Sequence, residues 1–303
     1  MPCVLRELVR EVREMGIIDQ IKKSAVQTGT KIQTSEAAQL EKILNKMFYL
    51  EKNIEEETAF VKQVMTRGLE NQERVGLHAS AIIVSDNQFC TRQQVLSLSY
   101  KQLQGEQVPI GLKRIFEEGN AIHEKWQRLF IRAGYAKAKT CDLTRYDVEY
   151  QMSYTPDIVC RIPEFFEGAM VVEIKSVNPM QFRKMQSHPS AQKQLQLYMH
   201  ACIKEAKRKK KWNGKDYTKG LVLCDDKGAQ EFKVFVYDYD PDFVAPYVDR
   251  LEAVQYHHNN FVENGKMIAR CKQCTAYTCK QAEKCPMKDA CWNKNNGRVR
   301  LCE

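Results

Sequence analysis

Three short runs of sequence govern the structure expected for this chain: Pro156-Asp157-Ile158-Val159, Val171-Val172-Glu173-Ile174-Lys175-Ser176 and Gln194-Leu195-Gln196-Leu197-Tyr198. Alternating and apolar residues predict two strands, over residues 154–162 and 169–177, joined by a short turn. Asp157 and Glu173 would then lie on neighbouring strands, and Lys175 would share a face with Glu173, because side chains alternate with period two. Carboxylates hold hard divalent cations, and an ammonium group can position an attacking water.

These residues resemble the motifs of one nuclease family, the PD-(D/E)XK nucleases in their RecB-like branch. The matching motifs are, in chain order, Gly119-x-x-x-His123, Asp157, Glu173-x-Lys175 and Gln194-x-x-x-Tyr198. A lone Glu-x-Lys triplet is a weak signal because such triplets arise by chance. All the motifs in the family's order, on elements of the right type, form a strong signal. The resemblance spans residues 80–292.

The resemblance implies an α/β fold with a restriction-endonuclease-like core, in which helices flank a mixed central sheet. Hydrophobic patterning adds strands over residues 220–224 and 232–239, and helices over residues 111–133, 187–207 and 241–262. The first of these helices has an apolar face formed by Ile115, Ile122, Trp126, Leu129 and Phe130. His123 lies within that face, where a buried structural histidine is the ordinary interpretation. Its spacing from Gly119 and the downstream carboxylates favour a metal ligand instead.

The function implied by the resemblance is that of a metal-dependent DNA nuclease, with exonuclease action on single strands or DNA ends in replication, recombination or repair. Mg²⁺ or Mn²⁺ would be held by His123, Asp157, Glu173 and the carbonyl of Ile174. Lys175 would align the water, Gln194 would orient the substrate backbone or the lysine, and Tyr198 would support the same wall. The alternative is a nucleic-acid-binding or assembly protein of the same fold without catalytic activity, against which the intact motif residues argue.

Composition and charge fit a soluble protein with polyanionic partners. The chain has 303 residues, 43% of them hydrophobic and 28% charged, with a net charge of +9. No stretch approaches the ~18 apolar residues of a membrane span, and the N-terminus has no signal-like apolar run. We therefore expect a cytoplasmic protein. No phosphate-binding Gly-x-x-x-x-Gly-Lys-Ser/Thr loop occurs, so any ATP dependence would require a partner such as a helicase or a recombination protein.

The chain divides into three predicted regions: a helical N-terminal region over residues 1–76, the nuclease core over residues 77–262 and a cysteine-rich tail over residues 263–303 that packs on the core. Apolar residues recur at helical spacing in the first region, near residues 4–12, 40–48 and 54–64. This region has no catalytic constellation. It is interpreted as a helical cap on the core, or as an appendage that guides DNA or binds a partner.

The tail contains five cysteines within residues 271–291: Cys271, Cys274, Cys279, Cys285 and Cys291. Cysteines this dense in a reducing compartment indicate metal rather than disulfides. In iron–sulfur members of the branch, such as AddB-type and CRISPR-associated RecB-like nucleases, a lone cysteine also precedes the core. Cys90 resembles that residue.

Two metal sites are therefore compatible with the sequence. One is a 4Fe-4S cluster that joins Cys90 to three tail cysteines. The other is a local zinc site of Cys271, Cys274, Cys285 and Cys291, with Cys279 as a possible substitute in either site. The spacing of the tail cysteines departs from the usual CxxC, five residues and cysteine of the family.

The most basic run, residues 204–211, follows the motif helix. Such runs are usually solvated, but beside a nuclease centre this one could bind phosphates through Arg208, Lys209 and Lys210. Trp212 could stack on a base, although packing is its commoner role.

Overall fold

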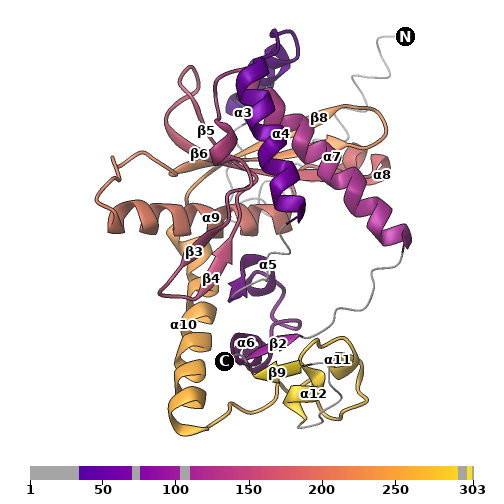
Figure 1. Ribbon diagram of the computed structural model, residues 1–303, viewed down its shortest axis with the longest axis vertical. Helices are drawn as coiled ribbons and strands as arrows, with labels where there is room; N and C mark the ends of the chain where they lie inside the picture. Colours follow the sequence, from indigo (N-terminus) through magenta and orange to yellow (C-terminus); the bar gives the residue numbers. More distant parts are fainter. Residues whose placement is uncertain (1–33, 70–75, 103–109, 293–298, 302–303) are drawn as a thin grey trace, which may run out of the picture.

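The structure is a computed structural model that describes residues 34–69, 76–102, 110–292 and 299–301 (Figure 1). It is an α/β protein with a central four-stranded sheet in the order β5-β6-β7-β8. The strands are β5 (Ile158–Ile162), β6 (Phe166–Val177), β7 (Lys219–Asp226) and β8 (Phe232–Asp238). The β6–β7 pair is parallel and the other two pairs are antiparallel, so the sheet is mixed. The predicted fold class, a mixed central sheet flanked by helices, is confirmed.

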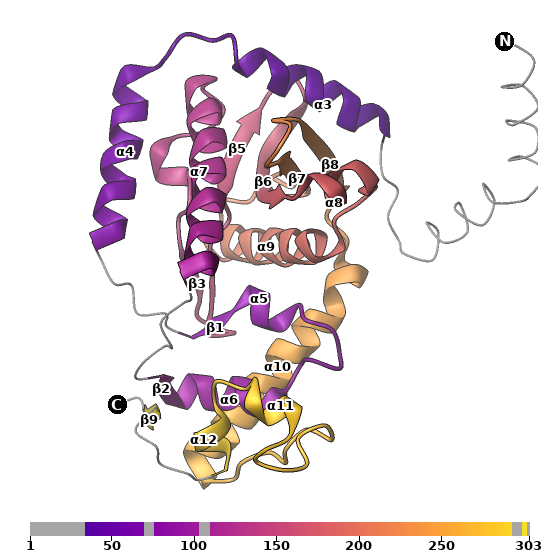
Figure 2. The same ribbon diagram turned by 90° about the vertical axis from the view of Figure 1, so that its right-hand side faces the viewer.

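Helices cover both faces of this sheet. On one face lie α3 (Thr34–Met47), α4 (Ile54–Leu69) and α7 (Ile110–Arg132), and on the other lie α9 (Pro189–Arg208) and the start of α10 (Pro241–Asn264) (Figure 2). Strand β6 serves both layers, because Val172 and Ile174 belong to the core under α7 while Val171 belongs to the core under α9. Burial on both faces explains why β6 reads as a nearly continuous apolar run.

The N-terminal helices share the core of the sheet. Leu40 and Leu44 of α3 and Phe60 of α4 are fully buried, in one cluster with Trp126 of α7. Residues 34–69 therefore pack on the core, as a helical cap would. The apolar pattern near residues 4–12 lies outside the described residues.

A second, small sheet has the order β1-β4-β3, with β1 at Leu77–His78, β3 at Arg145–Asp147 and β4 at Met152–Tyr154. The sequence predicted one strand over residues 154–162, but the structure divides it into β4 and β5. Pro156 lies between them and lacks the N–H that a continuous ladder would need. The remaining short elements near the core are α5 (Ala79–Ile82), η1 (Ala138–Thr140) and α8 (Pro179–Lys184).

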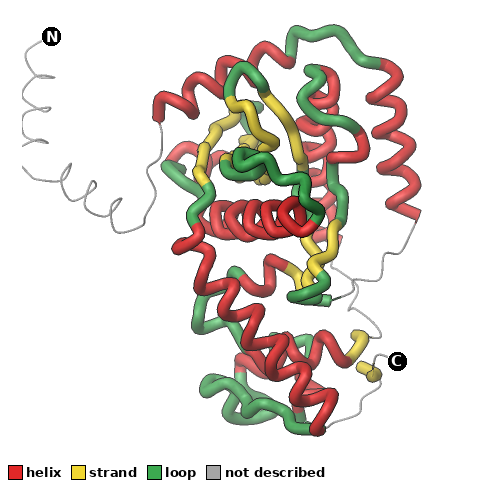
Figure 3. The backbone as a smooth tube through the Cα atoms, turned by 90° about the vertical axis from the view of Figure 1, so that its left-hand side faces the viewer, coloured by secondary structure: helices red, strands yellow, loops and turns green. Residues whose placement is uncertain are grey.

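Helix α10 connects the main body to the cysteine-rich region (Figure 3). It begins at the N-cap Asp240, whose side chain accepts hydrogen bonds from two backbone N–H groups, and ends at Gly265 in the left-handed conformation. Beside its C-terminal half lie α6 (Thr91–Ser99), β2 (Tyr100–Gln102), α11 (Lys280–Glu283), α12 (Lys288–Cys291) and β9 (Val299–Leu301). Helix α12 packs on α6, and β2 pairs with β9, so two distant segments meet here.

Within the described residues, no helix combines the length and apolar character that crossing a membrane requires.

Candidate functional site

Helix α7 brings His123 to the carboxylates. Its Nδ1 atom lies 3.2 Å from Oδ1 of Asp157. One turn further along α7, the side chain of Gln127 donates a 3.0 Å hydrogen bond to the backbone carbonyl of Asp157. Burial lowers the pKa of His123, but the negative charges of Asp157, Asp142 and Glu173 outweigh this effect, so its pKa is raised. The imidazole is therefore held next to a carboxylate in a partly buried position.

Asp157 lies just before β5, opposite the centre of β6. Its Oδ2 atom accepts a 2.6 Å hydrogen bond from the backbone N–H of Ile174. Glu173 and Lys175 follow on the adjacent strand, with Nζ of Lys175 2.6 Å from Oε1 of Glu173. The structure thus brings His123, Asp157, Glu173 and Lys175 together, although Asp157 lies in the bend just before β5 rather than within a strand as predicted.

Glu173 is the most constrained of these groups. The residue is 1% exposed, and its Oε2 atom is buried without a hydrogen-bond partner. Burial, and next the repulsion of Asp157, raise the pKa of Glu173 to about 8 despite the attraction of Lys175. An unsatisfied buried carboxylate oxygen is costly, which makes this atom the natural position for a cation.

Lys175 is the first member of a chain of hydrogen bonds that extends to polar side chains on α9. It donates a 3.2 Å hydrogen bond to Oε1 of Gln194, whose Nε2 donates a 2.8 Å bond to the hydroxyl of Tyr198. Burial lowers the pKa of Lys175, but Glu173 and Asp157 outweigh it, so the pKa is raised and the lysine stays charged. Gln194 and Tyr198 therefore fix the direction of the ammonium group.

The donor types fit Mg²⁺ or Mn²⁺, which prefer carboxylate oxygen and accept imidazole nitrogen. In the described part of the chain, no group of three or more histidine, cysteine, aspartate or glutamate side chains already surrounds one metal position. One oxygen of Glu173 contacts Lys175, and one oxygen of Asp157 contacts the N–H of Ile174. Metal binding would therefore use Oε2 of Glu173 and Oδ1 of Asp157, with His123 turning from its carboxylate partner.

Two residues near the site were not predicted from the sequence. Asp225, 2% exposed at the end of β7, accepts hydrogen bonds from Nζ of Lys125 at 2.5 Å and from Nε1 of Trp126 at 2.7 Å. It therefore anchors α7 just beyond His123. His188 is the N-cap of α9, and burial followed by the charge of Lys175 lowers its pKa. Only its place before Pro189, a common first helical residue, marked it as a helix start.

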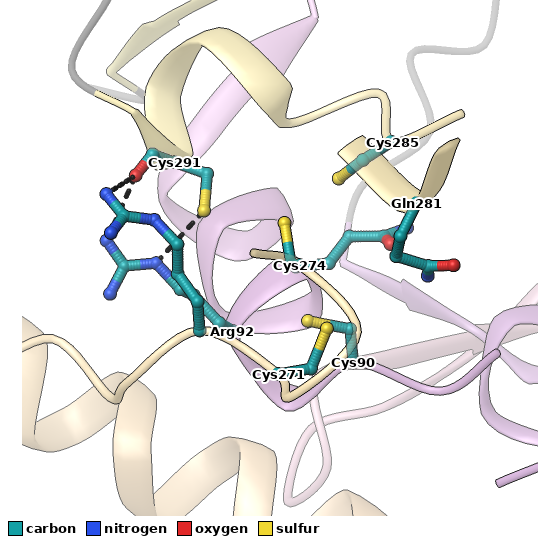
Figure 4. Close-up of a pocket in the computed structure, with 9 residues that line it drawn as sticks. Cys90, Arg92, Cys271, Cys274, Gln281, Cys285 and Cys291 are labelled. Atoms are coloured by element: carbon teal, nitrogen blue, oxygen red, sulfur yellow. Dashed lines mark hydrogen bonds between the residues drawn. The ribbon is translucent and has the colours of Figure 1, made fainter. Parts of the chain in front are cut away.

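The cysteine-rich region gathers five sulfurs around a cavity of about 20 Å³. The cysteines that line it are Cys90, Cys271, Cys274, Cys285 and Cys291 (Figure 4). Their sulfur atoms turn toward a common centre. Burial raises the pKa of Cys90 and raises that of Cys285 to about 12, with neighbouring cysteines adding to both shifts. Cysteines from before and after the core therefore meet at one place.

Two guanidinium groups border the same cavity. Arg92 donates from Nε to the sulfur of Cys291 at 3.2 Å, and it also bonds the carbonyl of Ile268. Arg270 also lines the cavity and donates to the carbonyl of Cys291 at 2.9 Å, an oxygen that Arg92 binds as well. Positive charge next to thiols favours thiolates, which are the form that binds metal.

Cys279 lies outside this cavity. It is the N-cap of α11, where its sulfur accepts a hydrogen bond from the N–H of Ala282 at 3.4 Å. Backbone N–H groups lower the pKa of its thiol to about 7. Cys279 does not line the cavity, but it lies close enough to Cys274, which does, to help raise the pKa of that thiol.

The basic run is remote from the carboxylates. Arg208 ends α9, which places it about 21 Å along the helix from Gln194 at 1.5 Å per residue. Lys209 forms an ion pair with Glu205 at 2.5 Å, and Lys210 lies in the following turn with a positive φ of 55°. The indole of Trp212 donates to the carbonyl of Asp216 at 3.0 Å, and Lys207 lies over its ring. The structure does not bring this group to the catalytic residues.

No family model and no curated protein matches this chain. Among solved structures it is similar to LHK-Exo, an alkaline exonuclease from Laribacter hongkongensis, at 14% identity and a TM-score of 0.37, and to LHK-Exo in complex with dAMP at 13% and 0.42. Both comparisons cover 62% of this chain and 90% of the other. The comparison with the structure of SSO0001 gives 14% sequence identity and a TM-score of 0.37, and it covers 77% of this chain and 96% of that chain. Because these identities and TM-scores are low, the function is inferred from the geometry of this chain's own residues.

Proposed function

We propose that this protein is a metal-dependent DNA nuclease of the RecB-like branch, acting as an exonuclease on single strands or DNA ends. The observation that carries the proposal is the buried, unpartnered Oε2 atom of Glu173, a carboxyl group whose other oxygen contacts Lys175 and whose pKa is affected by the charges of Asp157 and His123. A purely structural ion pair would satisfy this oxygen. A cation site would leave it free.

Each residue has a specific role in phosphodiester hydrolysis. His123, Asp157, Glu173 and the carbonyl of Ile174 would hold Mg²⁺ or Mn²⁺, which when bound activates water near neutral pH and offsets charge on the leaving oxygen. Lys175 orients the attacking water, because Glu173 and Gln194 fix its ammonium group from two sides. Tyr198 holds Gln194 in place through its hydroxyl. Gly119, on the same helix face as His123, lies beside Ser176 at the end of β6, where a Cβ would make an ordinary contact with Oγ at 3.5 Å.

We further propose that four of the five cysteines lining the cavity bind a metal through thiolate sulfur. A 4Fe-4S cluster and a single Zn²⁺ share this chemistry. The position of Cys90 at the cavity supports a site that joins both ends of the core. A zinc site formed by the tail cysteines alone would not need Cys90 there. Arg92 and Arg270 would offset the net negative charge of a thiolate site.

The test of the nuclease proposal is digestion of oligonucleotides labelled at one end, single-stranded and double-stranded, with Mg²⁺, Mn²⁺ or EDTA. The proposal expects shortening from an end that requires the divalent cation. Binding of DNA without cleavage under every metal condition would support the alternative of a binding or assembly protein. Substitution of RNA for DNA in the same assay establishes the sugar preference.

A further inference from the structure

The face of α7 that carries His123 continues beyond the end of the sheet. Residues three or four positions apart share a helix face, so Leu112 and Phe116 lie in line with His123. Gly119 marks the end of contact with the sheet, since a Cβ there would lie 3.5 Å from Oγ of Ser176. Residues 110–118 are all exposed, and Figure 1 shows this half of α7 projecting past the strands.

The projecting half is more apolar than a solvated helix requires. Its exposed large side chains are Ile110, Leu112, Ile115 and Phe116, and Phe116 is 52% exposed. The sequence placed Ile115 in the buried stripe of this helix, which was wrong because the sheet ends before reaching it. Contiguous exposed apolar groups beside a site indicate a binding surface. Phe116 precedes His123 by seven residues, about 10 Å along the helix axis.

The charges around Phe116 are suited to a polyanion. Lys113 borders the His123 face and Arg114 lies nearby, and neither takes part in an ion pair among the described residues. Of the two acidic residues here, Glu118 is already paired with Lys227 at 3.0 Å, which leaves Glu117 as one exposed carboxylate beside two exposed cations. Exposed aromatic rings next to unpaired cations are the usual means of holding single-stranded nucleic acid.

A hollow lies on the other side of the site, beside α8. It has a volume of about 500 Å³ and is lined by Met180, Lys184 and His188, among others. Met180 is 76% exposed, and His188 is near enough to Lys175 for the lysine charge to affect it. Figure 2 shows α7 and α8 on opposite sides of the end of β6. A strand crossing the site would therefore contact α7 on one side and this hollow on the other.

We propose that the projecting half of α7 binds single-stranded nucleic acid and that Phe116 stacks on an unpaired base. This inference rests on the proposed function and assigns its substrate form. A duplex keeps its base faces stacked inside the helix and exposes them only at its two terminal base pairs, so the surface favours an unwound strand. Lys113 and Arg114 contact the phosphates on either side of the stacked base.

The experiment measures binding of a fluorescein-labelled single strand in EDTA, where no cleavage occurs. Phe116→Ala is expected to weaken binding roughly 5- to 100-fold, the usual range for losing one stacked base. Tyr256→Ala is the matched control, since Tyr256 is a 65% exposed aromatic residue on α10. Phe116→Trp should retain affinity, and the added indole should lose fluorescence when the strand binds, relative to wild type. Binding of covalently closed circular duplex, which has no terminal base pair, should be equal in all variants.

Each outcome separates this inference from the nuclease proposal. Equal single-strand affinity for wild type and Phe116→Ala overturns the inference, whether or not the protein cleaves DNA. A wild-type dimer that Phe116→Ala converts to a monomer in sedimentation would also overturn it, because the surface would then be an interface between copies. Binding that depends on Phe116 in a protein that never cleaves would support the inference and contradict the nuclease.

Discussion

Nζ of Lys175 lies 2.6 Å from Oε1 of Glu173, while the other oxygen of that carboxylate is buried without a partner. One side chain is therefore both half of an ion pair and an unsatisfied acceptor. Such a group destabilises the fold unless a ligand completes it, so it is retained at sites of function more often than in a core. The same pairing raises the pKa of Lys175, so the lysine stays charged, and fixes its ammonium group beside the carboxylate.

The first prediction concerns stability and pH in metal-free protein. The folded-state pKa of Glu173 is raised above its unfolded value of about 4.5, so the folded state holds the extra proton between these two values. The free energy of unfolding should therefore fall as pH rises from 5 to 8. Each pH unit between the two pKa values is worth about 1.4 kcal/mol. In Glu173→Gln this decline should be absent. The free energy of unfolding of wild type minus that of the variant should therefore become more negative as pH rises. If urea titrations from pH 5 to 8 give the same difference in free energy of unfolding at every pH, the raised pKa of Glu173 is contradicted.

The second prediction distinguishes the two classes of metal. EDTA should remove activity, and added Mn²⁺ should restore it, because an oxygen-ligated cation exchanges readily. Thiolate-bound metal should survive the same brief treatment, as followed by elemental analysis of the desalted protein. Activity that persists in EDTA and does not respond to Mn²⁺ would contradict a hard-cation mechanism.

The third prediction concerns Cys90. If it is a ligand, Cys90→Ser should release the metal and lower stability by about 3–5 kcal/mol, the range for removing a long-range cross-link if the disulfide model carries over. Cys279→Ser is the comparison variant and should keep the metal, because Cys279 adjoins Cys274 but does not itself line the cavity. Iron and zinc analysis with absorption near 400 nm separates a brown cluster from colourless zinc. Full metal content in Cys90→Ser would exclude Cys90 from the site.

The fourth prediction concerns Asp225 as a positioning residue. Asp225→Asn weakens the bonds to Lys125 and Trp126 that anchor α7, and should lower the free energy of unfolding by about 1–3 kcal/mol. Cleavage should slow, while affinity for single-stranded DNA in EDTA stays unchanged. Glu118→Gln removes a 53% exposed partner of Lys227 and should cost less than about 0.5 kcal/mol. Equal chemical denaturation curves for the two variants would contradict the anchoring role.

The sequence predicted the parts of this structure that local patterns encode. Strands β6, β7 and β8 and helices α7, α9 and α10 lie where alternation and helical spacing placed them, because their apolar sides face a core. The group of His123, Asp157, Glu173, Lys175, Gln194 and Tyr198 was also brought together as expected. Strand alternation predicted the proximity of Asp157, Glu173 and Lys175, whereas the placement of His123, Gln194 and Tyr198 beside them rested on the resemblance to the nuclease motifs.

Other features depend on tertiary contacts that no local pattern shows. The buried bonds of Asp225 join β7 to α7, which are about a hundred residues apart in the sequence. Helical spacing places both Ile115 and Trp126 on the apolar face of the helix, although Ile115 is 53% exposed and Trp126 is fully buried. That Cys279 does not line the cavity follows from its role as a helix cap rather than from its spacing in the sequence.

The most direct measurement is the rate at which wild type and Glu173→Gln degrade an end-labelled single strand with Mn²⁺. The variant keeps the shape of the side chain but lacks the charge that holds the cation, so it should lose activity by at least about a thousandfold while still binding DNA. Glu263→Gln, an exposed change on α10, controls for the loss of a negative charge and should cleave as wild type does. Cleavage by Glu173→Gln at the wild-type rate would contradict the assignment of this catalytic centre.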